Sequence, residues 1–412
     1  MNTTRKRAWQ GLNAILNEGQ YANLWLRQHG QTLSEEEKRW VTAVIYGVLR
    51  HREPLRWQWR DLVRNVPEPS IAVLLDMSVY QLFYLNKGAE YAIVNDAVEL
   101  CPRSKKGLVN AVLRQLLRRG PKPLPEPESI ADLALVTSHP QWLLQLWKAH
   151  YGEEKMRRIA LADLEEAAVS VRINPLKLSR EALAQRPDWA LESNGWTIRT
   201  AGNPVSDPWL KEGKIVIQDR SSQQVALMLD PKPNDTVFDA CSAPGTKTTQ
   251  LAAMMNNEGS ILACDLHAHR LALVEEAAQR CGATIIQTRT LDAAQADQQL
   301  AGRQFDRVLL DVPCSGLGVL RHKPEILLRL TPDSLDEIVA LQAAILTHCA
   351  PLCKPGGTLV YSTCTLNRKE NDKQVAAFLL QHPEFELMAE QTIFPDEGAQ
   401  DGFYIAKMTR RG

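Results

Sequence analysis

Two cysteines each follow a hydrophobic run of the sequence. Cys364 lies in "TLVYSTCTLN", directly after the β-branched run that starts at Thr358, and Cys314 lies in "LLDVPCSGLG", after a run that ends at Asp311. A thiolate is the strongest nucleophile among common side chains. In α/β proteins ligands bind beyond the carboxyl ends of the strands. One such cysteine alone is typical of a buried structural thiol, whereas two at neighbouring strand ends favour covalent chemistry.

A tight turn in "DACSAPGTKTT", residues 239–249, precedes a helical pattern. Backbone N–H groups at the start of a helix can hold an anion or a carboxylate. The segment has neither the GxxxxGK[ST] phosphate loop nor the GxGxxG dinucleotide motif. A plain strand-to-helix turn would also fit the pattern.

Two acidic residues follow the next strands of the pattern. Asp265 comes 20–25 residues after the turn, where an acidic side chain binds ribose hydroxyls in nucleoside-binding folds. Asp292 follows the third strand and could face an adenine edge, or it could be a surface carboxylate. Together these positions predict an adenosine-bearing ligand.

The element pattern places these residues on a sheet. From about residue 234, short apolar runs alternate with helical patterns of about a dozen residues, which predicts a parallel, doubly wound α/β domain. We assign it to residues 211–412. The predicted strands are 236–240, 260–265, 284–289, 305–311 and 358–363.

Two further domains are predicted ahead of the sheet. Apolar residues recur at helical spacing almost throughout residues 1–120, which predicts an all-helical domain over 1–125. The proline-rich "PKPLPEPES" predicts a linker, and 138–210 reads as a small α+β connecting domain. Residues 1–120 contain 18 Lys/Arg and 11 Asp/Glu, although the whole chain has 48 of each. The excess indicates a polyanion-binding module, or simply a solvated helical surface.

These motifs resemble a known family. "DACSAPGTKTT", "LLDVPCSGLG" and "VYSTCTLNRKEN" are similar to the RNA cytosine-5 methyltransferases. "VIYGVLR", "YQLFYL" and "VNAVLRQLLR" resemble the antitermination-factor-type RNA-binding domain. The pairing resembles the bacterial 16S ribosomal RNA cytosine-5 methyltransferases of the Fmu/Sun (RsmB) group. The resemblance implies a Rossmann-like, S-adenosyl-L-methionine-dependent methyltransferase sheet that follows a helical RNA-binding domain and a small α+β segment.

The resemblance also implies roles for individual residues. Carbon 5 of cytosine is a poor nucleophile until a thiolate adds to carbon 6. Cys364 is implied as that nucleophile and Cys314 as the residue needed for product release. Asp311 is implied beside the ring nitrogen and exocyclic amine, in a protonated form raised in pKa by burial. Lys247 is implied to position the base and to stabilise a thiolate. The implied S-adenosyl-L-methionine contacts are Cys241, Ser242, Ala243, Pro244, Gly245, Thr246, Lys247, Asp265, Asp292 and Asp311.

One departure from the family pattern opens an alternative function. The usual loop "APGGKT" reads "APGTKT" here, with Thr246 in place of a glycine. Either this position has ordinary backbone angles, or a β-branched residue is strained there and cofactor affinity is reduced. The alternative is a non-catalytic RNA-binding or ribosome-assembly protein with a decayed transferase fold. An adenine amino-group methyltransferase would have Asn/Asp-Pro-Pro-Tyr where this chain has "DVPC".

The remaining features exclude some classes of protein. Eight cysteines without a CxxC pair indicate neither a disulfide framework nor a metal site. No run of about 18 apolar residues predicts a membrane span. The start, "MNTTRKRAWQGLNAIL", reads as an amphipathic helix rather than a signal peptide. We therefore expect a cytoplasmic protein, and we expect it to be a monomer. The family resemblance implies that it binds RNA, 16S ribosomal RNA in particular.

Overall fold

The chain forms two compact units in this computed structural model. The structure describes residues 3–85, 89–166, 168–200, 204–398 and 400–412. One unit comprises residues 1–166 with 320–329, and the other comprises 167–319 with 330–412. We call them the helical unit and the α/β unit, and each is described by itself.

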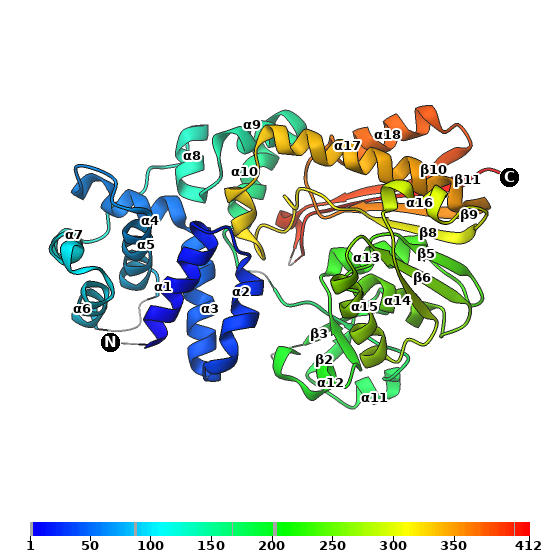
Figure 1. The fold of residues 1–412 in the computed structure, drawn as a ribbon, viewed down its shortest axis with the longest axis horizontal. Coiled ribbons are helices and arrows are strands. Elements are labelled where there is room, and N and C mark those ends of the chain that lie inside the picture. The colour runs from blue at the N-terminus through cyan, green and yellow to red at the C-terminus, as the bar shows by residue number, and fades with distance from the viewer. Residues whose placement is uncertain (1–2, 86–88, 167, 201–203, 399) are drawn as a thin grey trace. The chain divides into compact units, whose positions relative to one another are not determined.

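The helical unit is built from helices along residues 3–162 (Figure 1). It also includes the short 3-10 helix η6 (Pro324–Leu328). The α-helices are α1 (Thr3–Leu16), α2 (Ala22–His29), α3 (Glu35–Arg50), α4 (Arg52–Trp59), α5 (Pro69–Phe83), α6 (Glu90–Leu100), α7 (Lys106–Arg119), α8 (Ile130–Thr137), α9 (Gln141–Tyr151) and α10 (Glu153–Ala162).

Helix α3 illustrates why these sequences fold as helices. Ser34 and Glu37 form a reciprocal capping box at its start, which satisfies backbone donors that the first turn leaves unpaired. Its apolar residues recur on one face, so Val41, Val44 and Val48 are fully buried in a core shared with α1 and α5. The helical fold that the sequence predicts for the first part of the chain is confirmed.

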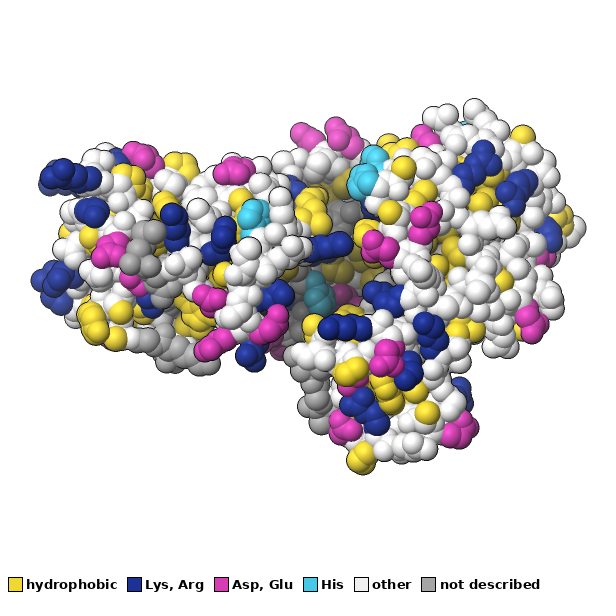
Figure 2. All heavy atoms as spheres, turned by 60° about the horizontal axis from the view of Figure 1, so that its bottom comes forward, with side chains coloured by type: hydrophobic (Ala, Val, Ile, Leu, Met, Phe, Trp, Pro, Cys, Tyr) yellow, Lys and Arg dark blue, Asp and Glu magenta, His cyan; other side chains and the backbone are white. Residues whose placement is uncertain are grey.

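The basic excess of the first third does not gather into one continuous patch on the face that Figure 2 shows. Lys and Arg side chains there lie among Asp and Glu side chains. Several are already paired within the helical unit, for example Arg119 with Asp61 at 3.0 Å and Lys105 with Glu68 at 2.8 Å.

The α/β unit begins with a small antiparallel sheet in the order β2-β3-β1-β4. Arg172 of this sheet is fully buried, a point that matters for the site below. The strands are β1 (Val171–Ile173), β2 (Trp189–Leu191), β3 (Thr197–Thr200) and β4 (Ile215–Ile217), and the helices are α11 (Arg180–Ala184), α12 (Pro208–Lys211) and α13 (Arg220–Leu229).

A seven-stranded sheet in the order β10-β11-β9-β8-β5-β6-β7 forms the rest of this unit. The strands are β5 (Thr236–Asp239), β6 (Ser260–Asp265), β7 (Ile286–Thr290), β8 (Phe305–Asp311), β9 (Cys353–Thr363), β10 (Phe385–Ile393) and β11 (Phe403–Arg410). The helices are α14 (Thr246–Met254), α15 (Ala268–Cys281), α16 (Ala296–Gln299), α17 (Pro332–Cys349) and α18 (Asp372–Gln381).

Five strands of this sheet are parallel, as the sequence predicts, but β10 and β11 are antiparallel. The sequence analysis did not predict these two strands. The middle of β10 is exposed, so the apolar run by which a buried strand is recognised is missing. The sheet is therefore mixed.

Helices cover both faces of this sheet (Figure 1). Leu359 and Tyr361 point to the face covered by α17 and α18, whereas Val360 points to the face covered by α13 and α14. This alternation is the period-two pattern of a strand buried on both sides. Helix α17 lies in a 21-residue stretch, Pro332–Leu352, that is long and apolar enough to cross a membrane by length and composition. Its Ile345 and Leu346 instead pack in this core.

Candidate active site

The two candidate cysteines lie in contact at neighbouring strand ends. Strands β8 and β9 are parallel neighbours, so the loop after β8 carries Cys314 to the same edge of the sheet as Cys364. Their Sγ atoms are 3.3 Å apart and share a hydrogen bond, and neither cysteine forms a disulfide. Each side chain is partly exposed. The sequence could predict the adjacency of the strands but not this contact.

The surroundings of the two thiols differ. The hydrogen bond to Cys364, together with burial, raises the pKa of Cys314 well above its ordinary value. Either sulfur can be the donor in this contact, and when Cys364 is ionised the Cys314 thiol can donate to it. A thiolate that accepts such a bond is stabilised, so the pair is arranged for a nucleophile at Cys364.

Lys247 and Asp311 form an ion pair beside the cysteines. Lys247 Nζ lies 2.7 Å from Asp311 Oδ2, and the Ser362 hydroxyl donates to Asp311 Oδ1 at 2.8 Å. Burial alone would lower the pKa of Lys247, but the charges of Asp311 and Cys364 raise it on balance. Lys247 is thus a largely buried cation at the thiol pair, and the sequence predicts this position only through the family resemblance.

The predicted cofactor loop, residues 241–247, connects β5 to α14. Gly245 has φ +96°, and a Cβ there would lie 3.1 Å from Val274 Cα, so this position requires glycine. Thr246 is instead the first residue of α14 and has no positive φ. Of the two explanations of the threonine, ordinary backbone angles are confirmed. Ser242 ties the loop to β6, since its N–H and hydroxyl both donate to the Cys264 carbonyl.

A small pocket lies inside this loop. It is lined by the loop from Cys241 to Lys247, by Asp311, and by Asp239 at the end of β5. The thiol of Cys241 is inert there, because burial raises its pKa well above the ordinary value.

Asp239 is a site residue that the sequence analysis did not single out. It is 1% exposed; Oδ2 accepts a hydrogen bond from the Thr248 hydroxyl at 2.7 Å, whereas Oδ1 is buried without a partner. Burial raises its pKa to about 7. A buried oxygen without a donor costs free energy unless a ligand supplies one. Its place at the end of a strand, two positions before the loop, was the signal available in the sequence.

Asp265 and Asp292 lie at the ends of β6 and β7. Asp265 is buried and accepts hydrogen bonds from the His267 N–H at 3.1 Å and from Arg270. Asp292 is half-buried and caps a 3-10 turn by accepting from the Ala294 N–H at 3.0 Å. Both lie on the edge that carries the pocket, and neither lines the pocket itself.

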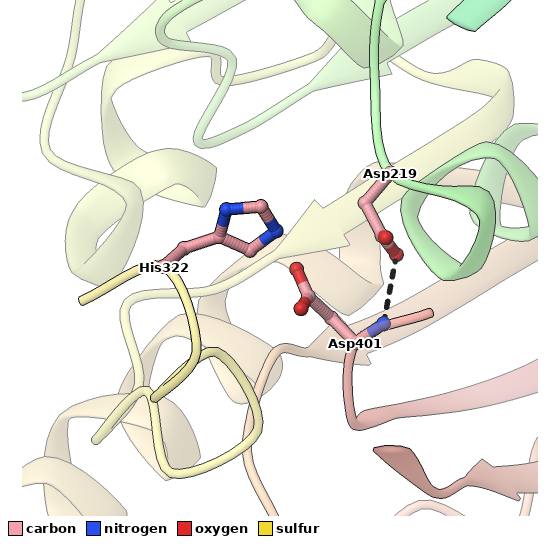
Figure 3. A group of neighbouring side chains, drawn as sticks. All are labelled: Asp219, His322 and Asp401. Atoms are coloured by element: carbon pink, nitrogen blue, oxygen red, sulfur yellow. Dashed lines mark hydrogen bonds between the residues drawn. The ribbon is translucent and has the colours of Figure 1, made fainter. Parts of the chain in front are cut away.

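Two further contacts hold the edge of the site in place. The guanidinium of Arg172 donates to the Thr246 carbonyl at 3.1 Å and to the Thr249 hydroxyl at 2.9 Å, so the small sheet fixes the start of α14. Asp219 accepts a hydrogen bond from the Asp401 N–H at 3.3 Å (Figure 3). That bond ties the segment before β11 to the start of α13. The sequence analysis predicted neither Arg172 nor Asp219 as a residue that supports the site.

The residues present fit S-adenosyl-L-methionine. The unpartnered oxygen of Asp239 suits an ammonium donor, the N-terminus of α14 suits a carboxylate, and Asp265 suits ribose hydroxyls. These are the polar groups of that molecule.

Comparisons with known proteins identify three segments of the chain. Residues 226–409 match the model "16S rRNA methyltransferase RsmB/F", residues 2–118 match the NusB family, and residues 139–200 match a ferredoxin-like domain of RsmF/B-like methyltransferases. The second of these corresponds to the predicted RNA-binding domain.

Whole-chain relatives agree. A protein of Bacillus subtilis named "Probable ribosomal RNA small subunit methyltransferase B" is 37% identical over 100% of this chain and 99% of its own length. The ribosomal RNA small subunit methyltransferase B of Proteus mirabilis is 30% identical over 99% of this chain and 98% of its own. Among solved structures, PH0851 superposes with a TM-score of 0.80 at 26% identity over 100% of this chain and 99% of its own. A methyltransferase homolog protein from Pyrococcus horikoshii has a TM-score of 0.61 at 28% identity over 70% of this chain and 100% of its own.

Proposed function

Because this chain belongs to the RsmB/F family of ribosomal RNA methyltransferases, it transfers methyl groups from S-adenosyl-L-methionine to ribosomal RNA, and we propose that the acceptor is carbon 5 of a cytosine in 16S ribosomal RNA. The observation that carries the proposal is the contact of 3.3 Å between Cys314 and Cys364 beside the Lys247–Asp311 pair. Carbon 5 methylation needs a nucleophile that adds to carbon 6 and a base that removes the carbon 5 proton, and two neighbouring cysteines can supply both, whereas amino-group methylation needs no thiol nucleophile.

Cys364 is the proposed nucleophile. Its thiolate forms a bond to carbon 6 of the cytosine, and the electron pair of the 5,6 double bond moves to carbon 5. The Cys314 thiol and the Lys247 ammonium stabilise the thiolate before attack. When bound, S-adenosyl-L-methionine supplies an electrophilic methyl group on a sulfonium.

Release of the product needs a base. A base takes the proton from carbon 5, the electrons of that C–H bond re-form the 5,6 double bond, and the bond from carbon 6 to Cys364 breaks, so that Cys364 departs as a thiolate. Cys314 is the proposed group for this release. To act as that base, Cys314 must first give its own proton to solvent. Asp311 is proposed to accept from the exocyclic amino group of the cytosine, with Lys247 and Ser362 holding its oxygens in position.

We propose that the implied cofactor contacts, the loop 241–247 with Asp265, Asp292 and Asp311, bind S-adenosyl-L-methionine, and that Asp239 joins them. The target base must leave any stack to reach this edge of the sheet. The predicted domains 1–125, 138–210 and 211–412 are likewise proposals, as are a cytoplasmic location, a monomeric state and the absence of a metal.

A trapped adduct tests the mechanism. The Cys314→Ala variant is incubated with S-adenosyl-L-methionine and 16S ribosomal RNA, and the products are separated on a denaturing gel. We expect a covalent protein–RNA adduct, and its loss when Cys364→Ala is added. An adduct in the double variant would mean that the roles are misassigned. No methylation by the wild-type protein, with RNA still bound, would instead favour a non-catalytic RNA-binding protein.

A further inference from the structure

A buried carboxylate, Glu370, connects the two cysteine loops. It follows Cys364 by six residues, it is 0% exposed, and it forms no ion pair among the described residues. Removing a carboxylate from water without a cation costs several kcal/mol unless hydrogen-bond donors replace the water. An uncompensated carboxylate here would destabilise the fold, so the groups that contact Glu370 indicate its role.

Four hydrogen bonds replace that water. Oε2 accepts from the Ser315 N–H at 2.9 Å and from Gln342 Nε2 at 3.0 Å. Oε1 accepts from the Ser315 hydroxyl at 2.5 Å and from Asn367 Nδ2 at 2.9 Å. Two of the four donors belong to Ser315, the residue that follows Cys314. Glu370, in the segment after β9, therefore holds the loop after β8 through hydrogen bonds.

A hydroxyl relay adds a second connection between these loops. Because the Ser315 hydroxyl donates its one proton to Glu370, the Thr365 hydroxyl donates to Ser315 Oγ at 2.6 Å. The Leu317 N–H in turn donates to Thr365 Oγ1 at 3.3 Å. Ser315 and Thr365 each directly follow one of the two cysteines, so the relay joins the two loops immediately beside the thiols.

We propose that Glu370 is a positioning residue that holds the Cys314 loop against the Cys364 segment, keeps the two Sγ atoms in hydrogen-bond contact and so selects Cys364 as the nucleophile. The inference rests on the proposed cysteine mechanism and deepens it. Neither sulfur touches Glu370, so its action is indirect. Its charge supports the same selection, since it helps to keep the proton on Cys314. The titratable groups that face Glu370 are Cys314 and Tyr361. The Tyr361 hydroxyl donates to the backbone carbonyl of Glu370.

Glu370→Gln tests the inference, because it keeps the shape and removes the charge. An amide has one oxygen, so its NH₂ group must face two N–H donors or one N–H and one O–H donor, and two of the four hydrogen bonds are lost. Small misplacements of reacting groups cost about 100-fold in rate. We expect kcat to fall about 100-fold, with KM for both substrates changed less than about twofold.

Thiol alkylation gives a readout that loss of stability alone would not move. Iodoacetamide is applied over a range of pH, and the modified cysteine is identified by mass spectrometry. In the wild-type protein we expect Cys364 to react first; in Glu370→Gln we expect that preference to be lost. Glu390→Gln is the matched control, since its carboxylate lies on β10 and accepts from the Tyr404 hydroxyl on β11, and it should retain the wild-type preference.

Ser315→Ala carries the same test if Glu370→Gln does not fold. It removes the hydroxyl relay but keeps the Ser315 N–H bond to Glu370, so a smaller fall in kcat and a partial loss of preference are expected. Wild-type kcat and wild-type preference in either folded variant would overturn the inference. Because alkylation needs no RNA, failure of the proposed methylation would appear separately, as an inactive wild-type protein.

Discussion

Asp239 offers a direct test of cofactor binding. Its pKa is raised to about 7 by burial, its Oδ1 atom has no hydrogen-bond partner, and the residue lines the pocket of the cofactor loop. If that oxygen receives the ammonium of S-adenosyl-L-methionine, the carboxyl must lose its proton on binding. Below about pH 7 the affinity should therefore fall about tenfold per pH unit, because the protonated form must first ionise. The Asp239→Asn variant has no proton to lose, and its weaker affinity should not change with pH.

The size of the effect follows from the pKa. Relative to the ordinary value of 3.8, about 7 corresponds to roughly 4 kcal/mol at about 1.4 kcal/mol per unit. Between these two values the folded protein binds more protons than the unfolded chain, so stability falls as pH rises through that window and then levels off. Asp239→Asn removes the titration. Relative to the wild type, the variant should gain stability from about pH 4 to about pH 8, by at most roughly 4 kcal/mol.

Calorimetry measures both effects. S-adenosylhomocysteine, which carries the same ammonium, is titrated in two buffers of different ionisation enthalpy to count the protons released on binding. We expect about one proton per ligand at pH 6 and almost none at pH 8. Asp333→Asn, an exposed carboxylate in the first turn of α17, is the control and should behave as the wild type. A wild-type affinity that is flat over this range, or an Asp239→Asn variant that keeps the pH dependence, would refute the reasoning.

Other predictions concern the residues that position the pocket. Lys247→Met should lower kcat at least about 100-fold. Because the pKa of Lys247 is raised in the folded protein, its contribution to stability is complete below pH 10.5 and is lost above its folded pKa. The free energies of unfolding of the wild type and Lys247→Met, measured in urea, should therefore converge at high pH. A difference that stays constant with pH would contradict this. Arg172→Met should cost about 2–4 kcal/mol and raise KM for S-adenosyl-L-methionine, because buried acceptors lose their donor; an unchanged melting temperature would contradict it. Gly245→Ala should destabilise by about 1–3 kcal/mol through its positive φ, measured by urea unfolding, and equal stability would be inconsistent. Thr246→Gly should lose at most about 0.5 kcal/mol of helix stability without tighter cofactor binding; a tenfold gain in affinity would show that the threonine does weaken the site.

Local patterns in the sequence predicted most of the elements. Helices such as α3 and the five parallel strands have strong periodic signals and end at capping residues or at Gly/Pro turns, so their positions follow from short-range chemistry. Strand β10 was missed because its exposed middle carries no apolar run. Its backbone hydrogen-bonding groups pair with those of β11. A search for apolar periodicity within a short stretch of sequence does not contain the partner strand, so it cannot predict this pairing.

The sequence by itself determined which groups stand at the edge of the sheet. A polar or nucleophilic residue directly after a buried strand must emerge at the carboxyl end, so Cys314, Cys364, Asp311 and Asp265 were identified from position alone. Thr246 shows the limit, since two backbone conformations remained open until α14 was seen to begin at that residue.

Only the tertiary structure decided how these groups act on one another. The contact between the sulfurs, the Lys247–Asp311 pair and the bonds from Ser315 and Gln342 to Glu370 join residues 28 to 64 positions apart. The Oδ1 atom of Asp239 is left without a hydrogen-bond partner. A hydrogen bond, a pKa and a desolvation cost depend on distances of a few ångströms. Residue order fixes such distances only within a turn or along one element, so strand order and loop packing set them here.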